Sequence, residues 1–407
     1  MCLLGDTMKK SKDYNYATMS IFLIVLFFSI SMFSLSVSCQ AGPDYWPTDS
    51  WQTSNVKKQG MNLELISDLK DYVEIHNVGL TSMLIVRNGY LVDETYYGSD
   101  RTNIINPIYS CTKSITSTLI GIAIYEGYLE GVQQKILDFF PNRTFENMDE
   151  DKQNITIWHL LTMTSGLEWN EYVSYYSPAN DLTAVKTESD WIQYILDKPM
   201  VSSPGTEFNY NTGGSHLLSA IIQKATGITM EAFALNHLFN YLNVTNYTWD
   251  TDSQGITRGG EALSLTSRDM AKMGFLYLHN GTWEDQQVVP KEWIQEATNR
   301  LVTSSSLNYA YGYQWWISRT GSIKHFSAWG WAGQRIFVVP SKNLVVIFTS
   351  FDTLSDVRRF LLEQYIIPAA SDDYGSSNIW MYYVIPISSV VVITGSATAF
   401  LMYRRRK

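Results

Sequence analysis

Two apolar patterns near the start of the globular part of the chain predict a helix followed by a hairpin. Residues 63–76 have apolar side chains at helical spacing. Two short apolar runs, 82–86 and 90–97, then flank Asn88-Gly89. Asn-Gly between two such runs is typical of a type I′ turn, because both positions require positive φ. We therefore expect a helix and then two antiparallel strands.

Apolar spacing along the rest of the chain predicts a helical middle followed by strands. From about residue 130 to 300 the pattern is mostly helical with long loops, and afterwards strand patterns return. Strands at both ends of a helical insertion predict an α/β protein of the α+β type, with an antiparallel sheet flanked by helices, a helical lobe, and a site in the cleft between them. The further elements expected are helices at 110–126, 262–278, 290–298 and 354–365, and strands at 312–318, 334–339 and 344–350.

The two ends of the chain carry long apolar stretches beside basic residues. Residues 19–38 have no charged side chain and follow Lys9, Lys10 and Lys12, so residues 1–40 are predicted to be a signal peptide or a signal anchor. A lipid-modified Cys39 is the alternative.

The second apolar stretch is long enough to cross a bilayer. Residues 379–403 are predicted to be a transmembrane helix, preceded by a polar stalk at 371–378 and followed by a basic cytoplasmic tail at 404–407. A buried C-terminal core helix is the alternative. Basic residues favour the cytoplasmic side, so residues 41–370 are expected outside the cell membrane, on a single-pass or two-pass protein.

Composition removes several classes of function. The 407 residues carry 39 acidic against 30 basic side chains, a net charge of -9, which argues against nucleic-acid binding. Three cysteines exclude a disulfide-stapled scaffold. The six histidines do not cluster at metal-ligand spacing, so no metal is predicted.

One Ser-x-x-Lys pattern stands in a chemically useful context. Ser110 and Lys113 open the predicted buried helix, and a spacing of three puts both side chains on one helix face. A lysine in a dry cleft has its ammonium form disfavoured and can act as the base that activates a serine. The same pattern at 54–57 and 67–70 lies in a polar lead-in and on a solvated helix, so only the pattern at Ser110 predicts a nucleophile.

Five sequence blocks, taken in order, resemble the serine β-lactamase-related hydrolases. That family includes class C β-lactamases, D-Ala-D-Ala carboxypeptidases, certain esterases and 6-aminohexanoate-dimer hydrolases. The resemblance covers about residues 60–368 and leans toward the 6-aminohexanoate-dimer-hydrolase-like branch. The blocks are 108–117 (IYSCTKSITS), 159–166 (HLLTMTSG), 204–210 (PGTEFNY), 265–270 (LTSRDM) and 329–334 (WGWAGQ).

The resemblance implies a set of catalytic residues. Ser110 would be the nucleophile, Lys113 its base, and Tyr210 the relay of a proton to the leaving group. The oxyanion hole would be formed by the backbone N–H groups of Ser110 and Trp331, with Trp331 at an edge strand. The reaction implied is acyl transfer to the serine followed by hydrolysis, without a cofactor.

Two departures from the family pattern affect the substrate. Thr212 stands where the family has the Asn of Tyr-x-Asn, and Ala328-Trp329-Gly330 replaces Lys or His, then Thr or Ser, then Gly. The groups that would receive a substrate carboxylate are therefore missing. We expect Thr212, Trp329 and Gly330 to contact the substrate, in an aromatic-lined pocket that the aromatic residues of 169–175 help to form.

The sequence thus predicts a membrane-anchored extracytoplasmic serine hydrolase that cleaves a small-molecule or peptide-like amide or ester. Two alternatives stay open: a non-catalytic surface binding module on the same fold, and a D-Ala-D-Ala carboxypeptidase or β-lactamase proper. Substrate and oligomeric state are left open by the sequence.

Overall fold

The computed structural model describes residues 43–98, 102–304, 309–351 and 357–370. The chain divides into a unit of residues 1–43 and a unit of residues 44–407, and the fold below is that of the second unit. The predicted signal or anchor segment, the stalk, the transmembrane helix and the tail lie outside the described residues. None of the helices in those described ranges has the length and apolar composition needed to cross a bilayer.

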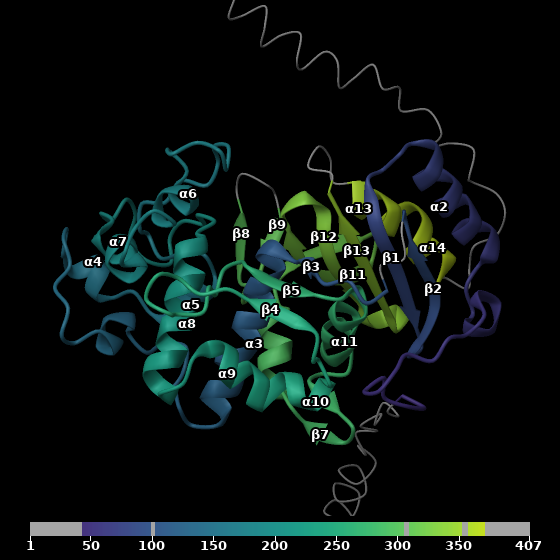
Figure 1. Cartoon of the computed structure of the whole chain (residues 1–407), viewed down its shortest axis with the longest axis horizontal. Helices are drawn as coiled ribbons and strands as arrows, with labels where there is room; N and C mark the ends of the chain where they lie inside the picture. The colour runs from purple at the N-terminus through teal and green to yellow at the C-terminus, as the bar shows by residue number, and fades with distance from the viewer. Residues whose placement is uncertain (1–42, 99–101, 305–308, 352–356, 371–407) are drawn as a thin grey trace, which may run out of the picture. The chain divides into compact units, whose positions relative to one another are not determined.

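An eight-stranded antiparallel sheet forms one layer of the domain, in the order β2-β1-β13-β12-β11-β10-β9-β8 (Figure 1). Among the described residues, the first strand, β1, pairs with the last, β13, with Leu84 opposite Ile347. The sheet is therefore complete only when both ends of the domain are present. Its strands are β1 Leu80–Arg87, β2 Tyr90–Tyr96, β8 Val302–Ser304, β9 Tyr309–Tyr311, β10 Trp316–Thr320, β11 Ile323–Gly330, β12 Gln334–Val339 and β13 Leu344–Ser350.

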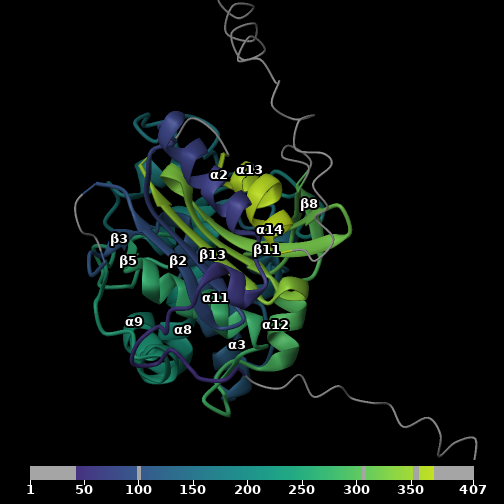
Figure 2. The same ribbon diagram turned by 90° about the vertical axis from the view of Figure 1, so that its right-hand side faces the viewer.

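Helices cover both faces of this sheet. Val345 and Ile347 of β13 belong to one core cluster, while Val346 and Phe348 belong to the other, because alternate side chains of a strand point to opposite faces. The second face is covered by α2 Leu63–Ile75 and by the C-terminal helices α13 Val357–Leu361 and α14 Ile367–Ala369 (Figure 2). On the first face α11 Ser267–Leu278 lies close to the sheet, since a Cβ at Gly274 would overlap Val345.

A helical lobe is built around two packed helices, α3 Thr112–Tyr125 and α8 Thr212–Thr226 (Figure 1). Every residue of α3 from Thr112 to Ala123 is buried, so this helix forms the centre of the lobe. The other helices are α4 Glu150–Gln153, α5 Ile157–Leu161, α6 Asp181–Val185, α7 Trp191–Asp197, α9 Met230–Ala234, α10 Asn240–Leu242 and α12 Lys291–Ala297. The short strands are β3 Asn106–Pro107, β4 Tyr247–Trp249, β5 Leu263–Leu265, β6 Thr282–Trp283 and β7 Gln286–Gln287.

The sheet flanked by helices, the added lobe and most predicted elements are confirmed. The hairpin turn has positive φ at both Asn88 (52°) and Gly89 (87°), as a type I′ turn requires. The helix predicted at 63–76 is α2, and the strands predicted at 334–339 and 344–350 are β12 and β13.

Three expectations about the elements are wrong. The helix predicted at 262–278 begins at Ser267, because Thr266 caps it by accepting a hydrogen bond from the Asp269 amide, and β5 precedes it. The strand predicted at 312–318 begins at Trp316, after a turn. Trp331 does not follow an edge strand: β11 lies between β10 and β12, because residues 302–320 add three more strands beyond it.

Candidate active site

Ser110 is held in a short 3-10 turn, Tyr109–Cys111, that leads directly into α3. The turn is anchored on each side, since the Ile108 amide donates to the Leu263 carbonyl and the Cys111 amide donates to the Ile108 carbonyl. Tyr109 has φ of 48°, a left-handed conformation that is costly for a residue with a side chain. The surrounding structure therefore fixes Ser110 in place at the start of the buried helix.

Lys113 reaches Ser110 directly. Its Nζ donates to Ser110 Oγ at 2.9 Å, to Thr212 Oγ1 at 2.9 Å and to the Gly260 carbonyl at 2.8 Å. The side chain is 1% exposed. These contacts use all three donors of an ammonium group.

Burial changes the acidity of this lysine. Desolvation lowers the pKa of Lys113 from 10.5 to about 8, and the negative charges of Glu171 and Glu261 oppose that change. At neutral pH a small but real fraction is therefore the neutral amine, which is the form that can accept a proton from Ser110.

Tyr210 lies against the same lysine, with Lys113 Nζ 4.8 Å from its ring centroid. Desolvation raises the pKa of the Tyr210 phenol well above its usual 10, while a hydrogen bond with Ser110 acts in the other direction. The segment is fixed next to α8, because the Asn209 amide donates to the Met163 carbonyl and Asn211 caps the helix. The structure thus brings the hydroxyl, the amine and the phenol predicted from sequence to one place.

Thr212 faces the lysine. Its Oγ1 accepts from Lys113 and donates to Glu171 Oε2 at 2.9 Å, and the residue is 3% exposed. Thr212 is therefore placed to bind the lysine side chain and not to contact a substrate. Glu171 also accepts from the Thr212 amide at 2.8 Å and from Trp169 Nε1 at 2.6 Å.

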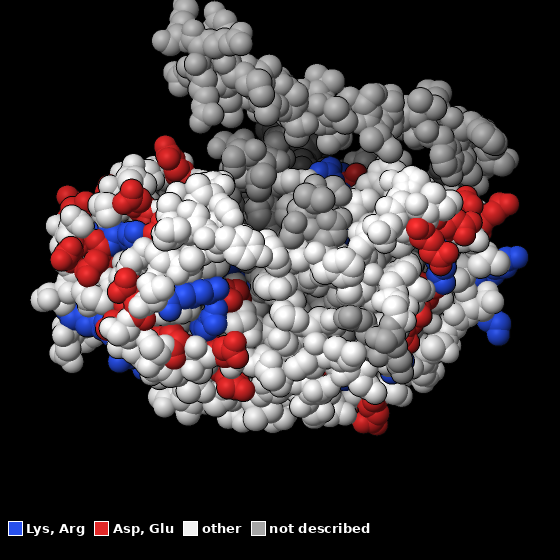
Figure 3. Space-filling view, turned by 45° about the horizontal axis from the view of Figure 1, so that its top comes forward, with Lys and Arg blue, Asp and Glu red and all other residues white. Residues whose placement is uncertain are grey.

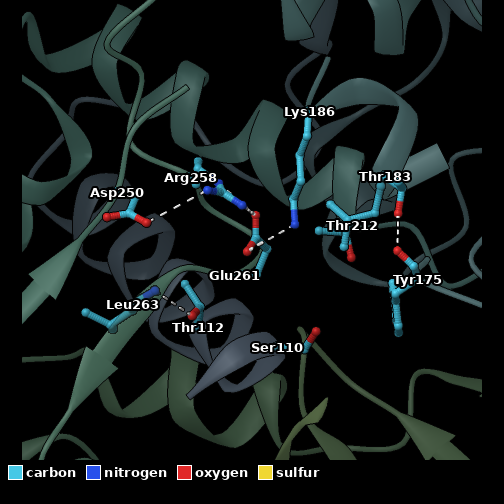
Figure 4. A network of polar contacts seen from close by, with 12 residues as sticks. Ser110, Thr112, Tyr175, Thr183, Lys186, Thr212, Asp250, Arg258, Glu261 and Leu263 are labelled. Carbon is cyan, nitrogen blue, oxygen red and sulfur yellow. Dashed lines mark hydrogen bonds and ion pairs between the residues drawn. The ribbon is translucent and has the colours of Figure 1, made fainter. Parts of the chain in front are cut away.

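A second buried carboxylate, on Glu261, contacts Arg258 and Lys186 (Figure 4), and its charge raises the pKa of Lys113. Its Oε1 accepts from Arg258 Nε at 2.7 Å, and its Oε2 is 3.9 Å from Lys186 Nζ. Sequence reasoning missed Glu171 and Glu261, because isolated acidic residues far apart in the chain carry no spacing signal. Gly260, whose carbonyl accepts from Lys113, was also missed, because a backbone carbonyl contributes no side-chain signal to the sequence.

Gly330, the last residue of β11, brings the neighbouring Trp331 to the site. A Cβ at Gly330 would overlap the Ile108 carbonyl oxygen, so only glycine allows this close approach. The Trp331 ring packs at 5.2 Å from that of Tyr109, and the Arg335 guanidinium holds the Gly330 carbonyl at 3.0 Å. The segment that would supply the second oxyanion donor is therefore fixed beside Ser110.

Trp329 belongs to an aromatic cluster that ends at Tyr210, the predicted proton relay. It stacks on Trp316 at 4.6 Å, and Trp316 stacks on Tyr210 at 6.1 Å. The Arg335 guanidinium lies over the Trp329 ring, 4.8 Å from its centroid. Of the aromatic residues of 169–175, Tyr175 lies beside Trp331, Trp169 is buried near Tyr194, and Tyr172 is exposed.

A cavity of about 240 Å³ adjoins Tyr109 and Trp331. Its walls carry no charged side chain, since the remaining lining residues are Thr81, Asn106, Pro107, Ala332, Gln334, Ser350 and Phe351. Within the ranges that the structure describes, no group of three His, Cys, Asp or Glu side chains is placed to hold a metal ion.

Residues 67–370 match the family model described as Beta-lactamase. A curated relative, the 6-aminohexanoate-dimer hydrolase of Paenarthrobacter ureafaciens, is 23% identical over 289 residues, covering 65% of this chain and 71% of that protein. Among solved structures, a family VIII carboxylesterase superposes with a TM-score of 0.61 at 13% identity, covering 78% of this chain and 98% of that chain. A class C beta-lactamase gives 0.58 at 16% identity, covering 75% and 95%.

The structural likenesses alone establish the fold, and the family match spans three quarters of the sequence. The family match and the fold agree with the site, in which a serine and a tyrosine contact a buried lysine. These observations together assign the protein to a family. The chain belongs to the beta-lactamase family and is a serine hydrolase of that family.

Proposed function

We propose that this protein hydrolyses an uncharged ester or amide through an acyl-enzyme formed on Ser110. The observation that carries the proposal is the 2.9 Å contact between Lys113 Nζ and Ser110 Oγ, made by a lysine that burial has prepared to act as a base.

The chemistry follows from the placement of these groups. Neutral Lys113 takes the proton of Ser110 as Oγ attacks the substrate carbonyl. The negative charge that develops on the carbonyl oxygen is stabilised by the backbone N–H groups of Ser110 and Trp331. Tyr210 donates a proton to the departing alcohol or amine and regains one from the lysine, and water then releases the acyl group by the reverse sequence.

The substrate is proposed to be uncharged near the reacting carbonyl. Ala328 is fully buried and uncharged, so no cation stands at this position, and Trp329 covers the Arg335 guanidinium with an aromatic face. The uncharged cavity beside Trp331 supports the same assignment. On the face drawn in Figure 3, charged side chains gather mainly toward the two sides of a largely uncharged band. The similar proteins named above, a 6-aminohexanoate-dimer hydrolase and a family VIII carboxylesterase, support ester or amide cleavage.

A fluorophosphonate probe and mass spectrometry test the proposal on the full chain. The wild-type protein should be labelled on Ser110, and Ser110→Ala should not be labelled. Ser67→Ala is the matched control, because Ser67 begins another Ser-x-x-Lys pattern, on α2, and should leave labelling intact.

A panel of a neutral ester, a neutral amide, a D-Ala-D-Ala peptide and a β-lactam then identifies the substrate class. Acylation of Ser110 by the first two supports the proposal. Acylation by the last two alone would replace it with a carboxypeptidase or β-lactamase activity. If none of these compounds acylates the wild-type protein, and the probe does not label it, the non-catalytic binding module is the remaining hypothesis.

We also propose that the domain is exported and anchored in the cell membrane, on the strength of the two apolar end segments. The exposure of sequon asparagines supports this location: Asn142, Asn154, Asn243 and Asn246 are exposed and Asn280 is half-buried. External protease should digest the domain on intact cells that express the full chain. Recovery of the full chain in the soluble fraction after lysis would contradict the anchor.

A further inference from the structure

The carboxylate of Glu171 is linked to the proposed catalytic lysine through Thr212, which contacts both side chains. It is 9% exposed. Its Oε1 accepts from two groups that can only donate, the Trp169 indole N–H and the Thr212 amide. Its Oε2 lies 2.9 Å from the Thr212 hydroxyl. An ionised carboxylate has no proton to give, so the single proton of that hydroxyl must point to Glu171.

The direction of this proton decides what the lysine can do. As an ammonium, Lys113 donates to Ser110, Thr212 and the Gly260 carbonyl. The neutral amine has only two N–H groups and one lone pair. The carbonyl accepts and cannot donate, so one N–H stays there. If the threonine hydroxyl donated to the lysine, it would occupy the lone pair that Ser110 needs.

We propose that Glu171 is a positioning residue: by holding the Thr212 hydroxyl as an acceptor toward Lys113, it leaves the lone pair of the neutral lysine free for Ser110. The inference rests on the proposed function, because it assigns the base of that reaction its orientation. It also explains how a hydroxyl serves where the family pattern has an amide, since a hydroxyl can turn either way and needs a second group to set its direction.

The charges around the lysine give the inference a measurable signature. The negative charge of Glu171 raises the pKa of Lys113, against the larger lowering by burial. Removing that charge should move the lysine pKa down, while burial is unchanged. The other titratable or charged groups that face Lys113 from the elements around it are Cys111, Glu261 with its partner Arg258, Lys186 and Tyr210.

Glu171→Gln tests the orientation directly. The amide oxygen can replace Oε1 in accepting from Trp169 and from the Thr212 amide, and the amide N–H₂ then donates to the threonine hydroxyl. The hydroxyl proton turns toward Lys113 and takes its lone pair. We expect kcat/KM for a neutral ester to fall at least about tenfold, and the acid limb of its pH profile to move to lower pH.

Glu168→Gln is the matched control, because this carboxylate lies three residues away in the same segment and is exposed. It should leave both the rate and the pH profile unchanged. Thermal unfolding of both variants shows whether the fold is kept.

Thr212→Val supplies a second readout. If Glu171 acts through the hydroxyl, the double variant Glu171→Gln, Thr212→Val should be no slower than Thr212→Val alone. A purely structural role of Glu171 predicts losses that multiply.

A titration that does not depend on turnover completes the experiment. Full-length protein carrying ¹³Cε-lysine is titrated by NMR, with Lys113→Arg assigning the resonance. A lower Lys113 pKa in Glu171→Gln than in Glu168→Gln supports the inference, and equal values overturn it. If the wild-type protein fails to acylate Ser110 but this shift is present, the proposed function fails and the coupling of Glu171 to Lys113 stands. If the wild type is active and both variants match it, the inference fails alone.

Discussion

Lys113 Nζ lies 2.9 Å from Ser110 Oγ, one turn apart at the start of a helix that is buried along nearly its whole length. The same lysine is held by a threonine and a backbone carbonyl from two other parts of the chain. Burial disfavours the ammonium form of this lysine, while the charges of Glu171 and Glu261 favour it less strongly, so its pKa is lowered to about 8.

The pH profile should report this lysine. In the proposed mechanism, activity toward a neutral ester requires the neutral amine, and burial lowers the pKa of Lys113 to about 8. We therefore expect kcat/KM to rise with pH and to reach half its maximum near pH 8. The pKa of Tyr210 is raised above 10, so this group should cause no decline below about pH 10. A profile that is flat between about pH 6 and pH 9 would show that Lys113 is not the base.

Tyr210→Phe should affect amides more than activated esters. The phenol is proposed to protonate the leaving group, and an amine needs that proton while a nitrophenolate does not. We expect kcat for an amide to fall about a hundredfold or more, with a much smaller loss for a nitrophenyl ester. Tyr194→Phe, on α7 and outside the site, is the control. Equal losses on the two substrates would indicate that Tyr210 serves packing only.

Trp329→Ala should change which acyl groups are accepted. Removing the ring deletes an aromatic wall and uncovers the Arg335 guanidinium that lies 4.8 Å from it. For esters with an aromatic acyl group, kcat/KM should fall about tenfold to a hundredfold, while esters that carry a carboxylate on the acyl group should gain relative to them. An unchanged ratio between the two ester types would place Trp329 outside the substrate pocket.

Gly330→Ala should damage the oxyanion hole. The added methyl group would overlap the Ile108 carbonyl and push the Trp331 amide away from Ser110. We expect about a hundredfold loss of kcat and a destabilisation of about 1–3 kcal/mol in the free energy of unfolding.

Gly214→Ala is the matched control for this variant. A Cβ there would meet Leu160 at 3.5 Å, an ordinary contact, inside a helix that favours alanine. It should be at least as stable as the wild type. A Gly330→Ala variant with full activity would show that the close packing of Gly330 against Ile108 is not what positions the Trp331 amide.

Local patterns predicted those parts of the fold that local rules control. The Asn88-Gly89 turn, helix α2 and strands β12 and β13 follow from turn chemistry and apolar spacing over a few residues. The start of α11 was missed, because a threonine cap and a short strand outweigh a continuous apolar pattern. The position of β11 inside the sheet was missed, because strand order depends on pairing between segments far apart in the chain.

The amino-acid sequence by itself indicated the candidate reacting groups: the serine and lysine share a helix face through their spacing of three, and the tyrosine is recognisable by its block. Only the tertiary structure decided what surrounds them. In the folded protein Thr212 contacts the lysine and Glu171 contacts Thr212. Trp329 lies over Arg335, and Gly330 packs closely against the backbone of Ile108. The reason is physical: spacing along a helix is a local property, whereas desolvation, the direction of a hydroxyl proton and the fit of one backbone against another arise only when distant segments pack together.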